Sequence, residues 1–333
     1  MSVTGTGISE KEPFSARSIF MRWELLLVVF IIITFIVNSN ISPYFLKTKV
    51  LLGMTFNFME LGIIVLIMSF IIIIGQIDLS VGSNMAMSAA VMGISYQLGL
   101  NMWVAVIIGL VAGTLGGLFN GFLITRVKIH SIIITLGTYS LFRGIAYVIL
   151  GDKFVSGYTD KFQYLGQGYI GNSLVPVELV IFSVLAVVFG IILHKSRFGR
   201  YMYAIGNNEL ASRYSGIPVD RIKVIIYTAS GFMCALAGIL FSSRVSVTRP
   251  NIGEAFLFEV VTVVLLGGVS IYGGQGSIVG VVLSLFLVGM VRYGLALVNI
   301  PANVMSVIIG FILITAILLP KALRRVFKGE EVM

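Results

Sequence analysis

Long apolar runs dominate the chain, and short polar or glycine-rich breaks separate them. A membrane-spanning helix needs about 20 mostly apolar residues. Stretches that meet this requirement lie at 23–38, 50–74, 79–99, 102–124, 129–150, 174–194, 223–243, 255–273, 276–298 and 303–320. The pattern therefore predicts an all-α polytopic membrane protein with about ten transmembrane helices.

The predicted number of spans depends on polar breaks at 75–78 and 273–275, which divide longer apolar stretches. If two pairs of neighbouring runs are single bent elements, the number falls to eight. The first run begins near Ile19 and no small-residue cleavage site follows it, so we expect a retained helix rather than a secretory signal.

Composition supports a membrane protein and excludes other classes. Hydrophobic residues make up 58% of the chain and charged residues 11%, whereas soluble domains carry about 25% charged residues. Such high hydrophobicity also excludes intrinsic disorder. A single cysteine and two histidines (Cys234, His130 and His194) leave little for a disulfide framework or a metal centre. We expect no catalytic site, metal or cofactor.

Basic residues lie in the short loops rather than on one face or arm, so the net charge of +9 does not indicate nucleic-acid binding. Of the 23 lysines and arginines, 15 fall in one set of loops, 6 in the opposite set, and Arg143 and Arg292 within spans. Because cytoplasmic loops carry the excess of basic residues, both termini are expected in the cytoplasm.

The predicted organisation is one transmembrane domain over 19–320, with a flexible cytoplasmic N-terminus at 1–18 and a cytoplasmic tail at 321–333. Two loops are longer than a connection needs. Residues 151–173 form an external loop, and residues 195–222 form a basic cytoplasmic loop.

Few ionisable residues lie inside the predicted spans, and each is costly there unless it has a partner. Glu60 and Arg143 both fall near mid-depth, so they are expected to form a structural ion pair rather than a proton relay. The others are Asp78, Glu259 and Arg292.

Asp78 lies in a glycine-rich break at 75–83, together with Ser80, Gly82 and Ser83. We favour a structural role for Asp78, fixing the break, over direct contact with a solute. A second glycine-rich break, which contains Gly274 and Ser277, resembles the first. Paired breaks in two halves of a chain indicate a transport pathway, although two unrelated turns would give the same pattern.

Glycines between Gly109 and Gly121 lie at nearly helical spacing, which is typical of close packing between membrane helices. The cytoplasmic loop contains the other informative pattern. Asn207 or Asn208 can cap a helix of about two turns, and Gly216 followed by Pro218 can end it. Ala211 and Ser215 then lie on one face. A helix built outside the membrane predicts a docking element for a soluble partner, although a solvated surface helix is the simpler interpretation.

Four blocks of the sequence, in order, resemble the inner-membrane permeases of ribose-type sugar ABC importers, within the branched-chain amino acid/ribose permease family. The first is Gly75-Gln76-Ile77-Asp78-Leu79-Ser80-Val81-Gly82-Ser83, with Gln76 in place of a glycine. The second contains Asn120, Thr135 and Arg143, with His130-Ser131 where the family usually has proline. The third contains Gly274 and Ser277. The fourth is Asn208-Glu209-Leu210-Ala211-Ser212-Arg213-Tyr214-Ser215-Gly216-Ile217.

The resemblance covers about residues 50–320 and implies a multi-pass protein of the bacterial inner membrane. It implies a second permease subunit, a separate ABC ATPase and an external sugar-binding protein as partners, with membrane lipid around the chain. The ATPase contact would involve Glu209, Ala211, Arg213, Ser215, Gly216 and Ile217. The chain itself has no Walker phosphate-binding loop.

Two functions from different classes remain open at this stage. The first is a permease subunit of an ATP-driven importer of a monosaccharide or sugar-like solute. The alternative is an ion-coupled secondary transporter, for which Asp78 and Glu60 are the central acidic candidates. The motifs do not distinguish ribose, other pentoses, hexoses, rhamnose and autoinducer-2, nor a homodimer from a pair of related permeases.

Overall fold

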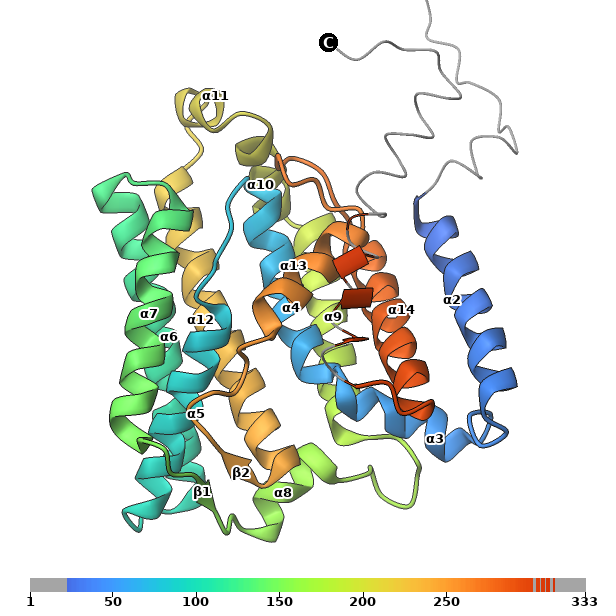
Figure 1. Ribbon diagram of the computed structural model, residues 1–333. Coiled ribbons are helices and arrows are strands. Elements are labelled where there is room, and N and C mark those ends of the chain that lie inside the picture. Colours follow the sequence, from blue (N-terminus) through green and yellow to red (C-terminus); the bar gives the residue numbers. More distant parts are fainter. Residues whose placement is uncertain (1–22, 302–303, 306, 309, 312–313, 315–333) are drawn as a thin grey trace, which may run out of the picture.

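The computed structural model describes residues 23–301 and positions 304–305, 307–308, 310–311 and 314. The elements in chain order are α2 (Trp23–Ile41), α3 (Thr48–Gly53), η1 (Met54–Asn57), α4 (Met59–Ile73), α5 (Val81–Gln97), α6 (Met102–Val127), α7 (Ser131–Leu150), β1 (Val155–Ser156), α8 (Asp160–Gln167), α9 (Val177–Lys195), α10 (Arg197–Asn207), α11 (Glu209–Tyr214), α12 (Val219–Val245), β2 (Val247–Thr248), α13 (Phe256–Leu266) and α14 (Ile278–Leu297) (Figure 1). Most of the predicted last span and both predicted terminal segments lie outside the described residues.

Within the described part of the chain, six helices are long and apolar enough to cross a membrane: α2, α6, α7, α9, α12 and α14. The pair α3–η1 and α4 is bent by 56° and makes a seventh candidate span. The predicted all-α polytopic fold is therefore confirmed. The predicted spans at 79–99 and 255–273 contain only the shorter helices α5 and α13.

Helix α4 is the centre of the fold, because every one of its 15 residues is buried. It packs against α9, α12, α13 and α14, while α5 packs against α6, α7 and α12. Helix α2 lies at the edge of the bundle against α14 (Figure 1). A helix that is apolar on all sides belongs in the interior, so the uniform apolar run of α4 places it there.

Two spans are broken inside the protein. After α4, residues 74–80 run back toward the middle of the bundle before α5 begins, and after β2 a second irregular segment does the same from the opposite end before α13 begins (Figure 1). Helix α13 has 11 residues, about 17 Å at 1.5 Å per residue, which is roughly half the hydrocarbon thickness of a bilayer. The prediction of a full helix over 255–273 is therefore wrong.

Arg143 joins the two broken spans at the point where they meet. From α7, its guanidinium donates to the backbone oxygens of Pro250 (2.6 Å) and Ile252 (2.8 Å), and to that of Gly82 in the first turn of α5 (3.3 Å). A Cβ at Gly82 would overlap the Gly253 carbonyl group. The contact therefore requires both a donor with several N–H groups and a residue without a side chain.

The predicted Glu60–Arg143 pair is wrong. Helix α4 begins at Met59, after the bend, so Glu60 lies in its first turn rather than at mid-depth. There it pairs with Arg244, from the last turn of α12. Glu178 is also fully buried and interacts electrostatically with both groups, but neither of its carboxylate oxygens has a hydrogen-bond partner among the described residues.

Glu259 and Arg292, which the sequence placed inside spans without partners, pair with each other at 2.7 Å. The predicted external loop at 151–173 is also structured. Strand β1 pairs with β2, the Tyr158 hydroxyl lies 2.6 Å from the Thr248 hydroxyl, and α8 packs against α12. These contacts hold the loop against the end of the bundle at which the chain, after β2, turns back toward α13.

We predict that Arg143→Met lowers the apparent Tm of the purified protein in detergent by several degrees. The substitution leaves three backbone oxygens without their donor, and an orphaned buried polar group costs about 1–3 kcal/mol. Differential scanning fluorimetry checks this, with Arg197→Met as the control because Arg197 is exposed on α10. Equal Tm values for the two variants would contradict the role of Arg143.

Candidate functional site

The predicted cytoplasmic loop at 195–222 forms two helices that project from one end of the bundle (Figure 1). The first, α10, was not predicted. Ser196 caps it by accepting a hydrogen bond from the backbone N–H of Gly199 at 3.1 Å. The second, α11, is the expected helix. We call α10 and α11 together the coupling segment.

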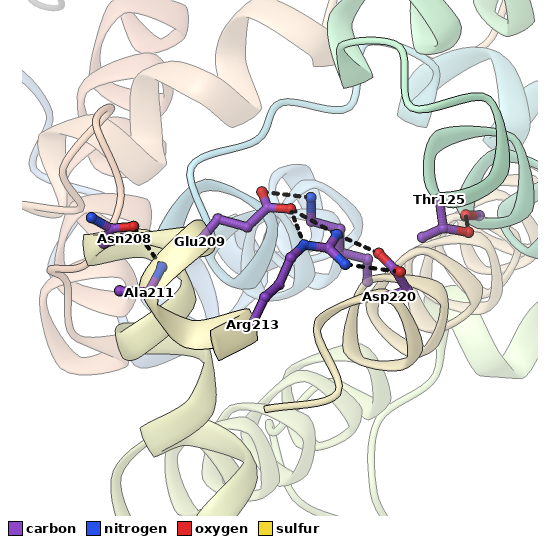
Figure 2. Close-up of polar contacts among 8 residues, drawn as sticks. Thr125, Asn208, Glu209, Ala211, Arg213 and Asp220 are labelled. Carbon is purple, nitrogen blue, oxygen red and sulfur yellow. Dashed lines mark hydrogen bonds and ion pairs between the residues drawn. The ribbon is translucent and has the colours of Figure 1, made fainter. Parts of the chain in front are cut away.

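Both ends of α11 have the predicted capping geometry. The Asn208 side chain accepts a hydrogen bond from the backbone N–H of Ala211 at 2.9 Å (Figure 2). At the other end Gly216 has φ of +80°, and the N–H of Ile217 donates to the Ser212 carbonyl at 3.1 Å. A left-handed residue followed by this bond is a Schellman ending, which favours glycine. Gly216 and Ile217 therefore end the helix and turn the chain toward α12.

Ion pairs hold α11 to the start of α12 (Figure 2). The Arg213 guanidinium contacts Glu209 at 2.9 Å within α11 and Asp220 at 2.9 Å on α12. Lys223, whose side chain is only 8% exposed, contacts the other Glu209 oxygen at 2.8 Å. The family resemblance implied that Arg213 contacts the ATPase, but its guanidinium is engaged within this chain.

Glu209 is the centre of this network. Partial burial opposes its charge, but hydrogen bonds from Lys223 and Arg213 outweigh burial and lower the pKa of the Glu209 carboxyl. The stabilisation is therefore present above the ordinary glutamate pKa and is lost only as the pH falls through the lowered value. Exposed ion pairs contribute little singly, so the network positions α11 rather than stabilising the whole fold.

The outward face of α11 is exposed. Leu210 is 62% exposed and Tyr214 85% exposed, and they are four residues apart on one side of the helix. Ala211 and Ser215, the predicted small residues, lie beside them and are also exposed. The sequence analysis did not select Leu210 or Tyr214, although two large apolar residues in a polar loop were a visible signal.

The two glycine-rich breaks meet beneath α10. The backbone N–H of Gly274 donates to the Ile73 carbonyl at 2.8 Å, and the Tyr203 hydroxyl of α10 donates to the Gly276 carbonyl at 2.7 Å. Any side chain at Gly206 would overlap both Ile73 and Gly274. The coupling segment is therefore seated directly on both breaks. Ser277, also predicted here, caps α14 by accepting from Gly280 at 3.1 Å.

Asp78 organises a buried polar cluster at the start of α5. One of its oxygens accepts hydrogen bonds from the backbone N–H (2.9 Å) and hydroxyl (2.6 Å) of Ser80, and the other accepts from the Ser230 hydroxyl of α12 at 3.2 Å. Asn120 of α6 donates to the Ser80 hydroxyl at 2.8 Å. The cluster thus joins α5, α6 and α12 at the break.

The remaining predicted residues lie around this cluster. Ser83 donates to the Ser80 carbonyl at 2.8 Å, and Thr135 of α7 donates to the Ser131 carbonyl at 2.8 Å. Gly82 and Arg143 form the separate contact with the returning segment before α13. Sequence reasoning missed Ser230, because a single serine in an apolar helix carries no distinguishing signal.

A cavity of about 490 Å³ lies between α11 and the first break. Polar and charged side chains line most of it, including Gln76, His130 and Ser131 together with the Glu209 network. Among the described residues, no group of three or more His, Cys, Asp or Glu side chains is placed to hold a metal ion.

Comparison with known proteins agrees with this geometry. The family described as "Branched-chain amino acid transport system / permease component" matches residues 50–317. The autoinducer 2 import system permease protein LsrD of Escherichia coli (strain K12) is 34% identical over 299 residues, covering 89% of this chain and 91% of the relative. The same protein from Enterobacter sp. (strain 638) is 34% identical over 304 residues, covering 90% and 92%.

No solved structure matches the chain. The family match covers most of the sequence and includes the breaks, the buried polar cluster and the coupling segment. The relatives are transporter permease subunits and not enzymes. With its apolar helices, the chain is a multi-pass protein of the bacterial inner membrane. It belongs to the branched-chain amino acid transport system permease family and is a permease subunit of an ABC importer.

Proposed function

We propose that this permease imports a monosaccharide or sugar-like solute, with energy from a separate ATPase subunit. The relatives at 34% identity are named for autoinducer 2 import, which supports a sugar-like substrate. An external binding protein delivers the solute, and a second permease subunit, either a copy of this chain or a related one, completes the pathway. Lipid surrounds the assembly.

The exposed face of α11 is the contact for the ATPase. Two observations support this assignment. The side chains of Leu210 and Tyr214 are exposed on one side of α11, and the Glu209–Lys223 ion pair attaches the helix to α12. Glu209 and Arg213 position the helix, Gly216 and Ile217 set its exit, and Ala211 and Ser215 allow a partner surface to approach closely. Well-packed aromatic and apolar anchors dominate the energetics of protein interfaces.

Two attachments carry movement of the coupling segment into the bundle. Through Lys223 and Asp220, α11 moves with α12, whose Ser230 contacts Asp78. Through Tyr203, α10 moves with the second break. Closure of the ATPase therefore favours one permease conformation through differential contacts at both breaks.

The broken spans form the element that opens and closes. In transporters, discontinuous helices near the bilayer midplane form the solute pathway. We assign Asp78, Ser80, Ser83 and Asn120 to fixing the first break. Gly82 with Arg143 fixes the junction of the first break with the segment before α13.

The proposed topology has ten spans and both termini in the cytoplasm. The coupling segment is then cytoplasmic, and β1, β2 and α8 are external. Residues 1–18 and 321–333 remain the proposed cytoplasmic N-terminus and tail, with a single permease domain at 19–320.

We predict that the double variant Leu210→Ser/Tyr214→Ser, in the reconstituted importer, loses ATPase stimulation by the solute-loaded binding protein. Two interface anchors of this kind are worth at least about 2 kcal/mol, so stimulation should fall by about tenfold or more. Leu98→Ser is the matched control, because Leu98 is 77% exposed at the far end of α5. Gly216→Val should give the same loss, since valine disfavours φ of +80°.

Stimulated ATPase activity that survives both Leu210→Ser/Tyr214→Ser and Gly216→Val would sink the coupling assignment. Measuring insertion and Tm of each variant separates loss of contact from loss of fold. Glu209→Lys, which places a third cation beside Arg213 and Lys223, should release α11 and reduce stimulation without removing its apolar face.

The topology has a separate test. Reporter fusions at residue 160, in α8, and at residue 333 should be external and cytoplasmic, respectively. A cytoplasmic signal at residue 160 would contradict the orientation and place the coupling segment on the wrong side for an ATPase.

A further inference from the structure

A second cavity, of about 650 Å³, opens between the cytoplasm-facing ends of α6 and α12. Thr125 and Asp220, both labelled in Figure 2, are among its lining residues. Its lining residues are Phe122, Thr125, Arg126, Lys128, Asp220, Arg221, Val224 and Ile225. Thr125, Lys128 and Asp220 also line the first cavity, but the proposed function gives no role to Phe122, Arg126, Arg221, Val224 and Ile225.

The charge of this cavity is unbalanced. Arg126, Lys128 and Arg221 are exposed, and none of them forms an ion pair with another described residue. Asp220 is the one acidic lining residue, and the Arg213 guanidinium already engages both of its oxygens. Three cations therefore face the same hollow with one carboxylate, Asp220, which Arg213 engages and which interacts electrostatically with Lys128.

The wall toward the bilayer is apolar. Phe122 is 53% exposed and Ile225 55% exposed, one from each helix. The exposed apolar surface continues away from the cavity along α6, at Phe119 and Leu115, and along α12, at Phe232. A ligand that fits must therefore join an anionic group to long apolar chains in one molecule.

We propose that this cavity binds the phosphate headgroup of an anionic phospholipid, with the acyl chains along the exposed faces of α6 and α12. Basic pockets between membrane helices on the cytoplasmic side recognise such headgroups. A soluble anion would use the three cations but not the apolar wall, and a zwitterionic lipid would use the wall but leave the cations partly uncompensated. Arg126 and Arg221 approach from different helices, so one bound headgroup bridges α6 and α12 beside the Arg213–Asp220 pair.

The test measures lipid retention by the assembled importer, using native mass spectrometry after exchange into nanodiscs of phosphatidylcholine with 30% phosphatidylglycerol. We expect Arg126→Gln/Arg221→Gln to weaken phosphatidylglycerol retention by about 30-fold, from the attraction of roughly two basic residues near a membrane surface. The matched control is Arg197→Gln/Arg200→Gln, which removes two exposed charges from α10 and should retain the lipid.

Three results would overturn the proposal. Equal loss of lipid from both double variants would mean general attraction to a charged surface. If inorganic phosphate alone displaced phosphatidylglycerol from the importer, the ligand of the cavity would be a soluble anion. The third result is weaker ATPase binding by Arg126→Gln/Arg221→Gln in nanodiscs of pure phosphatidylcholine, together with unchanged phosphatidylglycerol retention in the mixed nanodiscs. That result would mean that the cavity belongs to the ATPase contact.

Discussion

Arg143 satisfies three backbone oxygens inside the bundle, and the two broken spans depend on that contact. Non-helical backbone at membrane depth is tolerated only where protein groups or water replace its missing hydrogen bonds. The segment before α5 and the segment before α13 meet this constraint at one place, with Gly82 allowing the close approach. In the first break, the Asp78 carboxyl supplies a replacement partner, because it accepts a hydrogen bond from the backbone N–H of Ser80. Both broken spans are therefore fixed by ionisable side chains, Arg143 and Asp78.

These fixed points lie between the coupling segment and the outer loops. Helix α12 spans the whole distance, with Lys223 and Asp220 at one end, Ser230 at the Asp78 cluster, and Arg244 at the other end beside Glu60. Because protein interiors are closely packed and transmit strain, a displacement of α12 at its first turn reaches each of these contacts. The permease can in this way respond to an ATPase subunit outside the membrane.

The apolar runs predicted the helices well, because length and hydropathy decide membrane insertion. Capping residues predicted α11 for a local reason, since Asn208 and Gly216 act within a few residues. Pairings between distant residues were not predictable from the sequence. Glu60 was expected to pair with Arg143, but because the chain bends before Met59, Glu60 lies in the first turn of α4 and pairs with Arg244. The half-helix α13 was missed because the apolar run continues past its end at Leu266, through Val269 and Ile271. The pairing of Val155 with Thr248 could not be predicted, because strands β1 and β2 have only two residues each and show no strand pattern in the sequence.

If an ATPase acts on α11, the coupling segment and the glycine-rich breaks should move as one body relative to the end of the bundle that carries β1, β2 and α8. Spin labels at Tyr214 and Tyr272, both more than four-fifths exposed, and at Leu98 test it directly in the assembled importer with Cys234→Ala. On trapping with ATP, the distance between labels at 214 and 272 should stay constant while that between 214 and 98 changes. A changed 214–272 distance with a constant 214–98 distance would contradict the account.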